Sequence, residues 1–159
     1  MLNINFDLFP ILSTRRLELR KVILDDANEF FILRSDKRVM EFMDRPLLTS
    51  VEEAAQMIRK IHGAAISNDS ITWAMSLKND KKMIGTIGYW KITKEHHRAE
   101  IGYLLDPDYW GKGLMQEAVL PVLEYGFNVM NLHSVEANVN PNNKASIKFL
   151  EKNKFVREA

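Results

Sequence analysis

The sequence predicts an α+β (mixed α/β) fold in a single domain over residues 1–159. Three strand-like runs follow one another in the middle of the chain, and helix and strand patterns alternate after them. This order favours a mostly antiparallel sheet flanked by helices over a doubly wound parallel sheet. A chain of 159 residues can bury about two thirds of its unfolded surface around one core. No internal repeat or linker divides it.

The first part of the chain contains one predicted strand and two helical segments. Residues 15–22 alternate apolar and charged side chains, which is typical of a half-buried strand. Residues 25–43 have a helical pattern that we expect to break near residues 35–36. Residues 51–66 carry apolar side chains on one face, and Ser50 and Glu53 have the spacing of a capping box. A helix is therefore expected to begin directly after Ser50.

The three central strands are predicted at residues 71–79, 82–92 and 97–106, with a hairpin turn at residues 79–82. A long helix is expected from residue 114 to residue 130, and Pro121 should kink it because proline lacks a backbone donor. Residues 133–140 read as a strand and residues 142–153 as a helix. Residues 154–159 look like the beginning of a further strand.

The composition limits the classes of function. Lys and Arg number 22 against 21 Asp and Glu, and this net charge of +1 gives no support to a nucleic-acid or membrane-surface partner. No apolar run approaches the roughly 18 residues of a membrane span, and the first residues do not resemble a secretion signal. The absence of cysteine excludes disulfides and thiolate nucleophiles. We therefore expect a cytoplasmic protein without a metal site.

Two glycines stand one residue apart between a predicted strand and a predicted helix, in the segment DYWGKG at residues 108–113. Unpaired N–H groups at a helix N-terminus favour a bound phosphate, and glycine lets the phosphate approach the backbone. The Walker pattern fails because Lys112 lies between the glycines, and the dinucleotide fingerprint fails because Gln116 replaces its third glycine. On these residues alone, a simple turn is an equal alternative.

This segment resembles the Q/R-x-x-G-x-G/A loop of the GNAT acyl-CoA N-acyltransferases, with Asp108 in place of the first Gln or Arg. Further segments resemble, in the same order, the RimJ/RimL-like branch that acetylates ribosomal-protein N-termini: STRRLELRKVILDDANEFF, MIGTIGYW, RAEIGYLLDPDYWGKGLMQEA and NVNPNNKASIKFLEKNKF. The resemblance runs from about residue 13 to the end. It implies a sheet whose fourth and fifth strands splay apart, with the pantetheine arm of acetyl-CoA in the gap.

The resemblance also implies the residues that hold acetyl-CoA. Exposed strand groups would pair with the arm, and the amides of the glycine loop and first helical turn would hold the pyrophosphate. The expected cofactor-binding residues are Tyr103, Leu104, Leu105, Trp110, Gly111, Lys112, Gly113, Leu114, Met115, Asn143 and Ser146. For Asn143 or its neighbour Asn142, a plain helix N-cap is the alternative reading.

The implied reaction moves the acetyl group of acetyl-CoA directly to a primary amine within a ternary complex. Glu100 is the first candidate for the base that accepts the amine proton, and Glu158 is the second. In the alternative reading, Glu100 is a surface glutamate paired with Arg98 or Lys91, and Glu158 is a charged residue of the tail.

The departing thiolate also needs a proton, and the developing oxyanion needs a donor. Ser146 is the candidate acid, because Leu150 occupies the position where many members of the family have a tyrosine. A strand backbone N–H near Leu104 would stabilise the oxyanion. Tyr89 and Trp90, on the strand beside Glu100, are the candidate residues of the acceptor pocket.

Several points stay open at the level of sequence. The amine could belong to a ribosomal-protein or other peptide N-terminus, a polyamine, an amino acid or an aminoglycoside-like compound. A non-catalytic acyl-CoA-binding or regulatory module is the alternative function, and a nucleic-acid-binding domain is disfavoured by the neutral charge.

The end of the sequence departs from the family in two ways. Lys154 stands where a helix-ending glycine is usual, and Asn153 is expected to take the left-handed position. The family's last strand pair is missing, so either the sequence is shortened or a second subunit of a homodimer supplies that wall.

Overall fold

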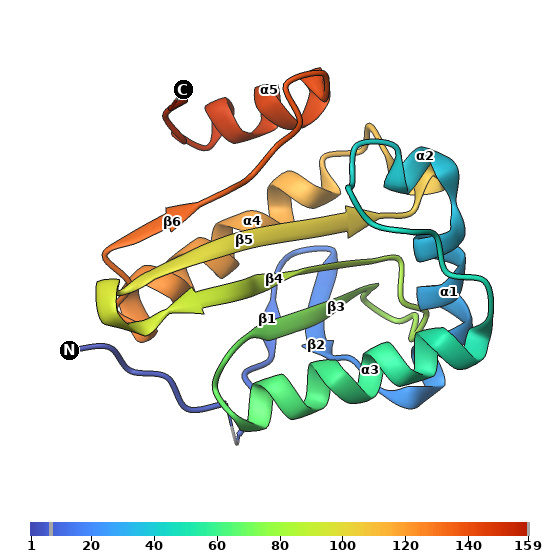
Figure 1. Cartoon of the computed structure of the whole chain (residues 1–159), viewed down its shortest axis with the longest axis horizontal. Coiled ribbons are helices and arrows are strands. Elements are labelled where there is room, and N and C mark those ends of the chain that lie inside the picture. Colours follow the sequence, from blue (N-terminus) through green and yellow to red (C-terminus); the bar gives the residue numbers. More distant parts are fainter. Residues whose placement is uncertain (7, 159) are drawn as a thin grey trace.

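The computed structural model describes residues 1–6 and 8–158 (Figure 1). The strands are β1 (Leu12–Ser13), β2 (Leu17–Lys21), β3 (Ile71–Leu77), β4 (Gly85–Thr93), β5 (Arg98–Leu105) and β6 (Ser134–Glu136). The helices are α1 (Ala27–Ser35), α2 (Lys37–Met40), α3 (Val51–Ile66), α4 (Leu114–Glu124) and α5 (Lys144–Lys152).

Within the described residues, the strands form one sheet in the order β1-β2-β3-β4-β5-β6. Neighbours from β1 to β5 are antiparallel, whereas β6 lies parallel to β5. In the β3–β4 hairpin, Asn79 adopts a left-handed backbone with φ of 73°, which asparagine tolerates better than most residues. The structure confirms the expected mixed α/β fold with a mostly antiparallel sheet.

Helices cover both faces of the sheet, with α1 and α3 on one face and α4 on the other (Figure 1). Side chains alternate between faces along a strand, so the consecutive residues Trp73 and Ala74 point in opposite directions. Trp73 is buried in the core that includes Val122 of α4. Ala74 is buried in the core that includes Phe30 of α1 and Ile58 of α3.

α2 and α3 begin where the sequence predicts. Asp36 has an extended backbone between α1 and α2, and its carboxylate accepts the backbone N–H of Arg38 at 2.8 Å, which confirms the expected break. Ser50 caps α3 by accepting the N–H of Glu53 at 3.2 Å. The Glu53 carboxylate accepts the backbone N–H of Thr49 at 2.8 Å.

The second half of the long predicted helix is irregular. Pro121 lies inside α4, where it cannot donate to the preceding turn, and the helix continues as a π-helical segment over Tyr125–Val129. No helix in the described part of the chain is long and apolar enough to cross a membrane.

The C-terminal segment differs from the expectation in two respects. Residues 155–158 have no strand conformation, because no neighbouring strand pairs with them in the described structure. Lys154 itself takes the left-handed position with φ of 68°, and Asn153 does not, with φ of −95°. The side chain of Asn153 instead exchanges two hydrogen bonds of 2.8 Å with Gln116, which ties α5 to α4.

Candidate active site

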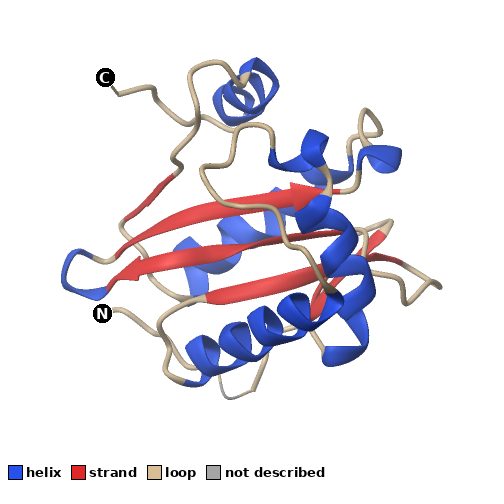
Figure 2. Ribbon diagram, turned by 45° about the vertical axis from the view of Figure 1, so that its right-hand side comes forward, coloured by secondary structure: helices blue, strands red, loops and turns tan. Residues whose placement is uncertain are grey.

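The candidate site is a cleft that opens where β5 and β6 part. The two strands pair only through Arg98–Glu100 and Ser134–Glu136, and then diverge (Figure 2). A cleft of about 1000 Å³ lies beyond the fork. It is lined by β5, the loop and first turn of α4, the segment after β6, α5 and the segment between α2 and α3. The expected splay of the family's fourth and fifth strands is therefore found between β5 and β6.

One edge of β5 faces this cleft without a strand partner. The N–H of Asp106 donates to the Ile84 carbonyl beside β4 at 2.8 Å, so strand alternation directs the backbone groups of Leu104 toward β4 as well. The groups of Tyr103 and Leu105 point into the cleft instead. The structure corrects the expectation for Leu104: its side chain lines the cleft, but its N–H is not available there for an arm or an oxyanion.

Trp110 uses one of the remaining edge groups. Its indole Nε1 donates to the carbonyl of Leu105 at 2.8 Å, and its ring lines the cleft with about half of its surface exposed. The edge groups left for a ligand are therefore the N–H and carbonyl of Tyr103 and the N–H of Leu105.

The glycine loop has the backbone that the sequence analysis expects. Gly111 and Gly113 have φ of 75° and 76°, in the left-handed region that favours glycine, and Gly113 caps α4. A side chain at position 111 would meet no atom within 4 Å, so the space beside this residue is open. The first intrahelical bond runs from Glu117 N–H to the Gly113 carbonyl, which leaves the preceding N–H groups at the helix start for other acceptors. This arrangement suits an anion.

Contacts from the N-terminal strands hold this loop in place. The Glu117 carboxylate of α4 accepts hydrogen bonds from the Thr14 hydroxyl and from the backbone and side chain of Arg16. The Arg16 guanidinium also donates to the Lys112 carbonyl at 3.0 Å. Burial alone raises the pKa of Glu117, but the bonds from Thr14 and Arg16 outweigh it and lower the pKa to about 2.

α5 contributes a second polar group to the cleft. Asn143 caps α5 by accepting the N–H of Ser146 at 3.2 Å, so the N-cap reading of this residue holds, and its amide NH2 group donates to none of the described residues. The Ser146 hydroxyl lies 2.7 Å from the Tyr103 hydroxyl, and the Tyr103 ring packs edge-on against Phe149. Burial raises the pKa of Tyr103 more than its bond to Ser146 lowers it, so the phenol stays protonated at neutral pH.

Glu100 lies at the vertex of the fork, where the pairing of β5 with β6 ends. It lines the cleft, and Asn138, just after β6, donates to its carboxylate. Among the described residues, no Lys or Arg lies within 4.0 Å of this carboxylate, because Arg98 pairs with Glu136 instead at 3.9 Å. The ordinary reading of Glu100 as one half of a surface ion pair is therefore not what the structure shows.

Trp90 lines the cleft on the same face of the sheet as Glu100, at an irregular point in the β4–β5 register. Its ring lies against Gly102, where a side chain of any size would collide with it at 2.2 Å. The Arg45 guanidinium lies 5.7 Å from the centre of the Trp90 ring. Tyr89 is fully buried on the opposite face, where its hydroxyl donates to the Val122 carbonyl at 2.6 Å. The expectation that Tyr89 lines the acceptor pocket is therefore wrong.

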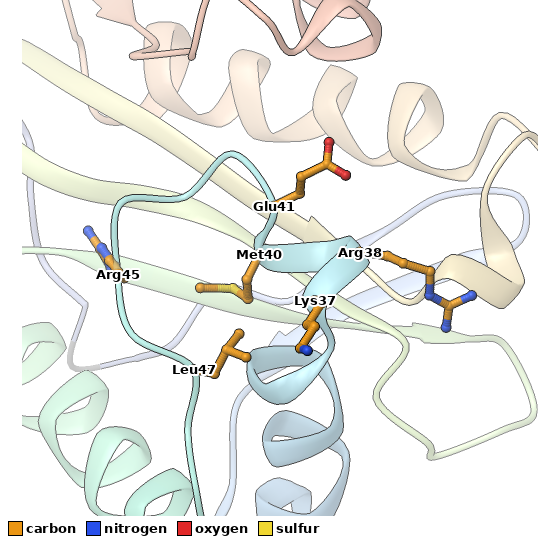
Figure 3. A pocket seen from close by; sticks show the side chains of 6 residues that line it. All are labelled: Lys37, Arg38, Met40, Glu41, Arg45 and Leu47. Atoms are coloured by element: carbon orange, nitrogen blue, oxygen red, sulfur yellow. The ribbon is translucent and has the colours of Figure 1, made fainter.

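The segment between α2 and α3 forms a smaller pocket of about 440 Å³ beside the cleft. Figure 3 shows the Met40 and Leu47 side chains at its centre, with Arg38 and Arg45 on opposite sides. Arg38 is paired with Asp36 at 2.8 Å.

Other residues singled out in the sequence lie elsewhere. Glu158 is exposed in the C-terminal segment and does not line the cleft, so the structure corrects the expectation of a second base there. The Lys112 amine lies over the Tyr109 ring, and only the backbone of Lys112 belongs to the glycine loop. The described residues contain no group of three or more His, Asp or Glu side chains that could hold a metal ion.

Sequence reasoning missed three contacts in the site. They are Arg16 with Glu117, Asn138 with Glu100, and Tyr103 with Ser146. Each joins elements that are distant in sequence, and no local spacing indicates such pairs. For Tyr103, the family resemblance implied a place beside the cofactor arm but did not identify the partner of its hydroxyl.

The sheet forks between β5 and β6, Glu100 lies at the vertex of the fork, and the glycine loop before α4 lines the same cleft. This combination is typical of the acyl-CoA N-acyltransferases. A family model described as an acetyltransferase (GNAT) domain matches residues 16–156, so the chain belongs to the GNAT family.

Similar proteins agree with this assignment. An uncharacterized N-acetyltransferase, p20 of Bacillus licheniformis, is 39% identical over 147 residues, covering 92% of this chain and 83% of the relative. The crystal structure of a GNAT-family acetyltransferase from Bacillus anthracis has a TM-score of 0.82 and 29% identity over 94% of this chain and 86% of that one. The ribosomal-protein-S5-alanine acetyltransferase of Vibrio fischeri has a TM-score of 0.81 and 27% identity over 94% and 85% of the two chains. The chain is an N-acetyltransferase, and the alternative of a non-catalytic module is not supported.

Proposed function

We propose that this enzyme transfers the acetyl group of acetyl-CoA to a primary amine, with the N-terminus of a peptide or protein as the leading acceptor class. The observation that carries the proposal is the fork between β5 and β6, with Glu100 at its vertex and the left-handed glycines at its wide end. The solved relative that is named for acting on a ribosomal protein supports the choice of acceptor.

Acetyl-CoA would enter the cleft with its pyrophosphate on the amides of residues 111–115. Two left-handed glycines and the open space beside Gly111 support this position. The pantetheine arm would run along the free edge of β5 and pair with the N–H and carbonyl of Tyr103 and the N–H of Leu105. The amide donor of Asn143 would meet the arm from the other side. The acetyl group then lies nearest the vertex of the fork.

In the proposed reaction, the amine nitrogen attacks the thioester carbon while its proton passes to Glu100, directly or through a water molecule. An α-amino group has a pKa near 8, compared with about 10.4 for a lysine side chain, so an N-terminal amine demands less of a carboxylate base. An outward N–H of β5, from Tyr103 or Leu105, would donate to the oxyanion of the tetrahedral intermediate.

The intermediate collapses by breaking the carbon–sulfur bond, which leaves the CoA thiolate. We propose that Ser146 gives its hydroxyl proton to this thiolate, and that the protonated Tyr103 phenol, 2.7 Å away, holds the serine hydroxyl in position. The products are the acetylated amine and CoA with a free thiol. Ser146 recovers its proton from water and the proton taken by Glu100 is released to solvent as the products leave, so both side chains return to their starting states.

The glycine loop can be tested by binding alone. In Gly113→Trp, an indole at the helix start should block the pyrophosphate, so calorimetry should detect no CoA binding. The matched control is Leu120→Trp, which places the same indole on an exposed position of α4 outside the cleft. Circular dichroism should show that both variants fold. Unchanged CoA affinity in folded Gly113→Trp would show that the loop does not hold the pyrophosphate.

A further inference from the structure

Two arginines have no carboxylate partner within 4.0 Å among the described residues: Arg45, which lines the acceptor end of the cleft, and Arg34, which lies outside the lining but close enough to feel the charge of Arg45. Arg45 is exposed in the segment between α2 and α3, and its guanidinium contacts the Trp90 ring. No carboxylate of the described residues lies within 4.0 Å of it. An arginine of this kind keeps all its donors available, because an aromatic face satisfies none of its hydrogen bonds.

Arg34, at the end of α1, is the second of these arginines. It is only 6% exposed, and its Nε is buried without a hydrogen-bond partner among the described residues. One of its other nitrogens donates to the Met57 sulfur at 3.4 Å, which is a weak acceptor. Burial, and then the nearby charge of Arg45, lower the pKa of Arg34. An unpaired buried charge is costly, and a second positive charge nearby raises the cost.

None of the nearby acidic groups forms a direct ion pair with Arg34 or Arg45. Asp36 is committed to Arg38, and Glu100 is bonded to Asn138. Glu41 and Asp44 also line the cleft, but both lie more than 4.0 Å from either guanidinium. In Figure 3 the Glu41 and Arg45 side chains point in different directions from the same segment. The guanidinium donors of Arg45 therefore remain available to an anionic group, and no described carboxylate competes for them at contact distance.

We infer that the acceptor carries an anionic group in addition to its amine, and that Arg45 binds this group, with Arg34 adding to the positive potential from behind. This inference rests on the proposed acetyl transfer to an amine. Arg45 is a specificity-determining residue in this account, and Arg34 acts through the field of its charge.

The geometry limits how far the anion lies from the amine. The amine would approach Glu100, whereas Arg45 stacks on the ring that covers Gly102. Glu100 and Gly102 are two strand residues apart, on the order of 7 Å, so the amine and the anionic group of the acceptor should be separated by about that distance. The α-carboxylate of a free amino acid is too close to its own amine to fulfil this condition. An acidic side chain in the first residues of a peptide fulfils it, and a phosphate on a longer small amine does so as well.

The test compares acceptors that differ in one charge. Three short peptides that begin Ala-Glu, Ala-Gln and Ala-Lys are measured for binding to the CoA-bound enzyme and for kcat/KM with acetyl-CoA. A phosphorylated amino alcohol and its unphosphorylated form serve as a second arm, which distinguishes a phosphate from a carboxylate as the anionic group. For the intact enzyme we expect a preference of about 10-fold for the anionic member of at least one pair, decreasing as salt is raised.

The variants assign this preference to Arg45. Arg45→Gln should abolish it, Arg45→Lys should retain part of it, and Arg45→Glu should favour the Ala-Lys peptide. The matched control is Arg59→Gln, which removes an exposed arginine of α3 that does not line the cleft and should leave the preference unchanged.

Binding and turnover separate this inference from the proposed function. Equal binding of the charged and neutral acceptors would overturn the anion subsite, even if all of them are acetylated. Preferential binding without acetylation of any amine would overturn the proposed reaction and support the subsite. A preference that survives in Arg45→Gln would also overturn the inference.

Discussion

At the scale of a single residue, the buried charge of Arg34 is expected to reduce stability. Its guanidinium is buried next to the Met57 sulfur and has no carboxylate partner within the described structure. We expect Arg34→Met to raise the free energy of unfolding by about 1 kcal/mol, because an apolar side chain of similar length removes the unpaired buried charge. The same change should weaken binding of an anionic acceptor severalfold.

Urea denaturation of Arg34→Met measures the stability change. The exposed substitution Arg59→Met is the control, with almost no expected effect on stability. A clear loss of stability in Arg34→Met would mean that the arginine is structural, which would contradict this account of the residue.

Glu100 carries the proposed proton transfer. Glu100→Gln keeps the shape of the side chain but removes the base, so kcat should fall by about 100-fold or more while the affinity for acetyl-CoA is unchanged. The matched control is Glu136→Gln, directly across the fork on β6, where the carboxylate is half exposed and pairs only loosely with Arg98. Steady-state assays of CoA thiol release provide the comparison. A variant with full activity would remove Glu100 as the base.

Sequence reasoning at this scale succeeded where a local rule applies. It placed Gly111 and Gly113 between a strand and a helix start, where the structure shows a left-handed backbone at both residues. It placed both Tyr89 and Trp90 in the acceptor pocket, although consecutive strand residues point to opposite faces. Which face borders the cleft depends on elements that are distant in sequence, and Tyr89 points to the other one. The unpaired state of Arg34 and Arg45 could not be predicted, because it depends on side chains that are remote in sequence.

The contact of α4 with β2 and the segment before it determines where the glycine loop lies. The pKa of Glu117 is about 2 in the folded protein, compared with 4.5 for an ordinary glutamate. Its contribution to stability is therefore complete above about pH 4.5 and is lost as the pH falls through 2. Glu117→Gln should be less stable than the parent protein at pH 6, and the difference should shrink between pH 4.5 and pH 2.

Urea denaturation at a series of pH values tests this expectation. Glu124→Gln is the matched control, because Glu124 is an exposed carboxylate on the same helix. CoA affinity of Glu117→Gln should also fall severalfold, since Arg16 then holds the Lys112 carbonyl less firmly. A stability difference independent of pH would contradict the role given to this carboxylate.

For the elements, the sequence predicted most of what local pattern controls. The break before α2, the cap of α3, the central hairpin and the helix after the glycines all follow from spacing and turn residues. The expected strand at residues 154–159 failed because its described residues have no pairing partner, and a strand depends on its neighbours more than on its own residues. The tie between Gln116 and Asn153 joins two helices and has no local signal.

For the whole molecule, the decisive feature is that β6 pairs with β5 over a short stretch and then diverges. The resemblance to the family implied this fork, whereas strand patterns alone could not, because they do not report how long two strands stay paired. Parallel pairing of β6 with β5 follows the crossover through α4 on one face of the sheet. That crossover brings the glycine loop, Glu100 and α5 to a single cleft.

The most direct test of the central claim is a crystal structure of the protein with CoA. We expect the pyrophosphate on the amides of residues 111–115, the pantetheine arm between β5 and β6 beside Tyr103, and the thiol closer to Glu100 than to the glycine loop. A CoA molecule bound outside this fork, or one that enters with its thiol at the glycine loop, would contradict the account.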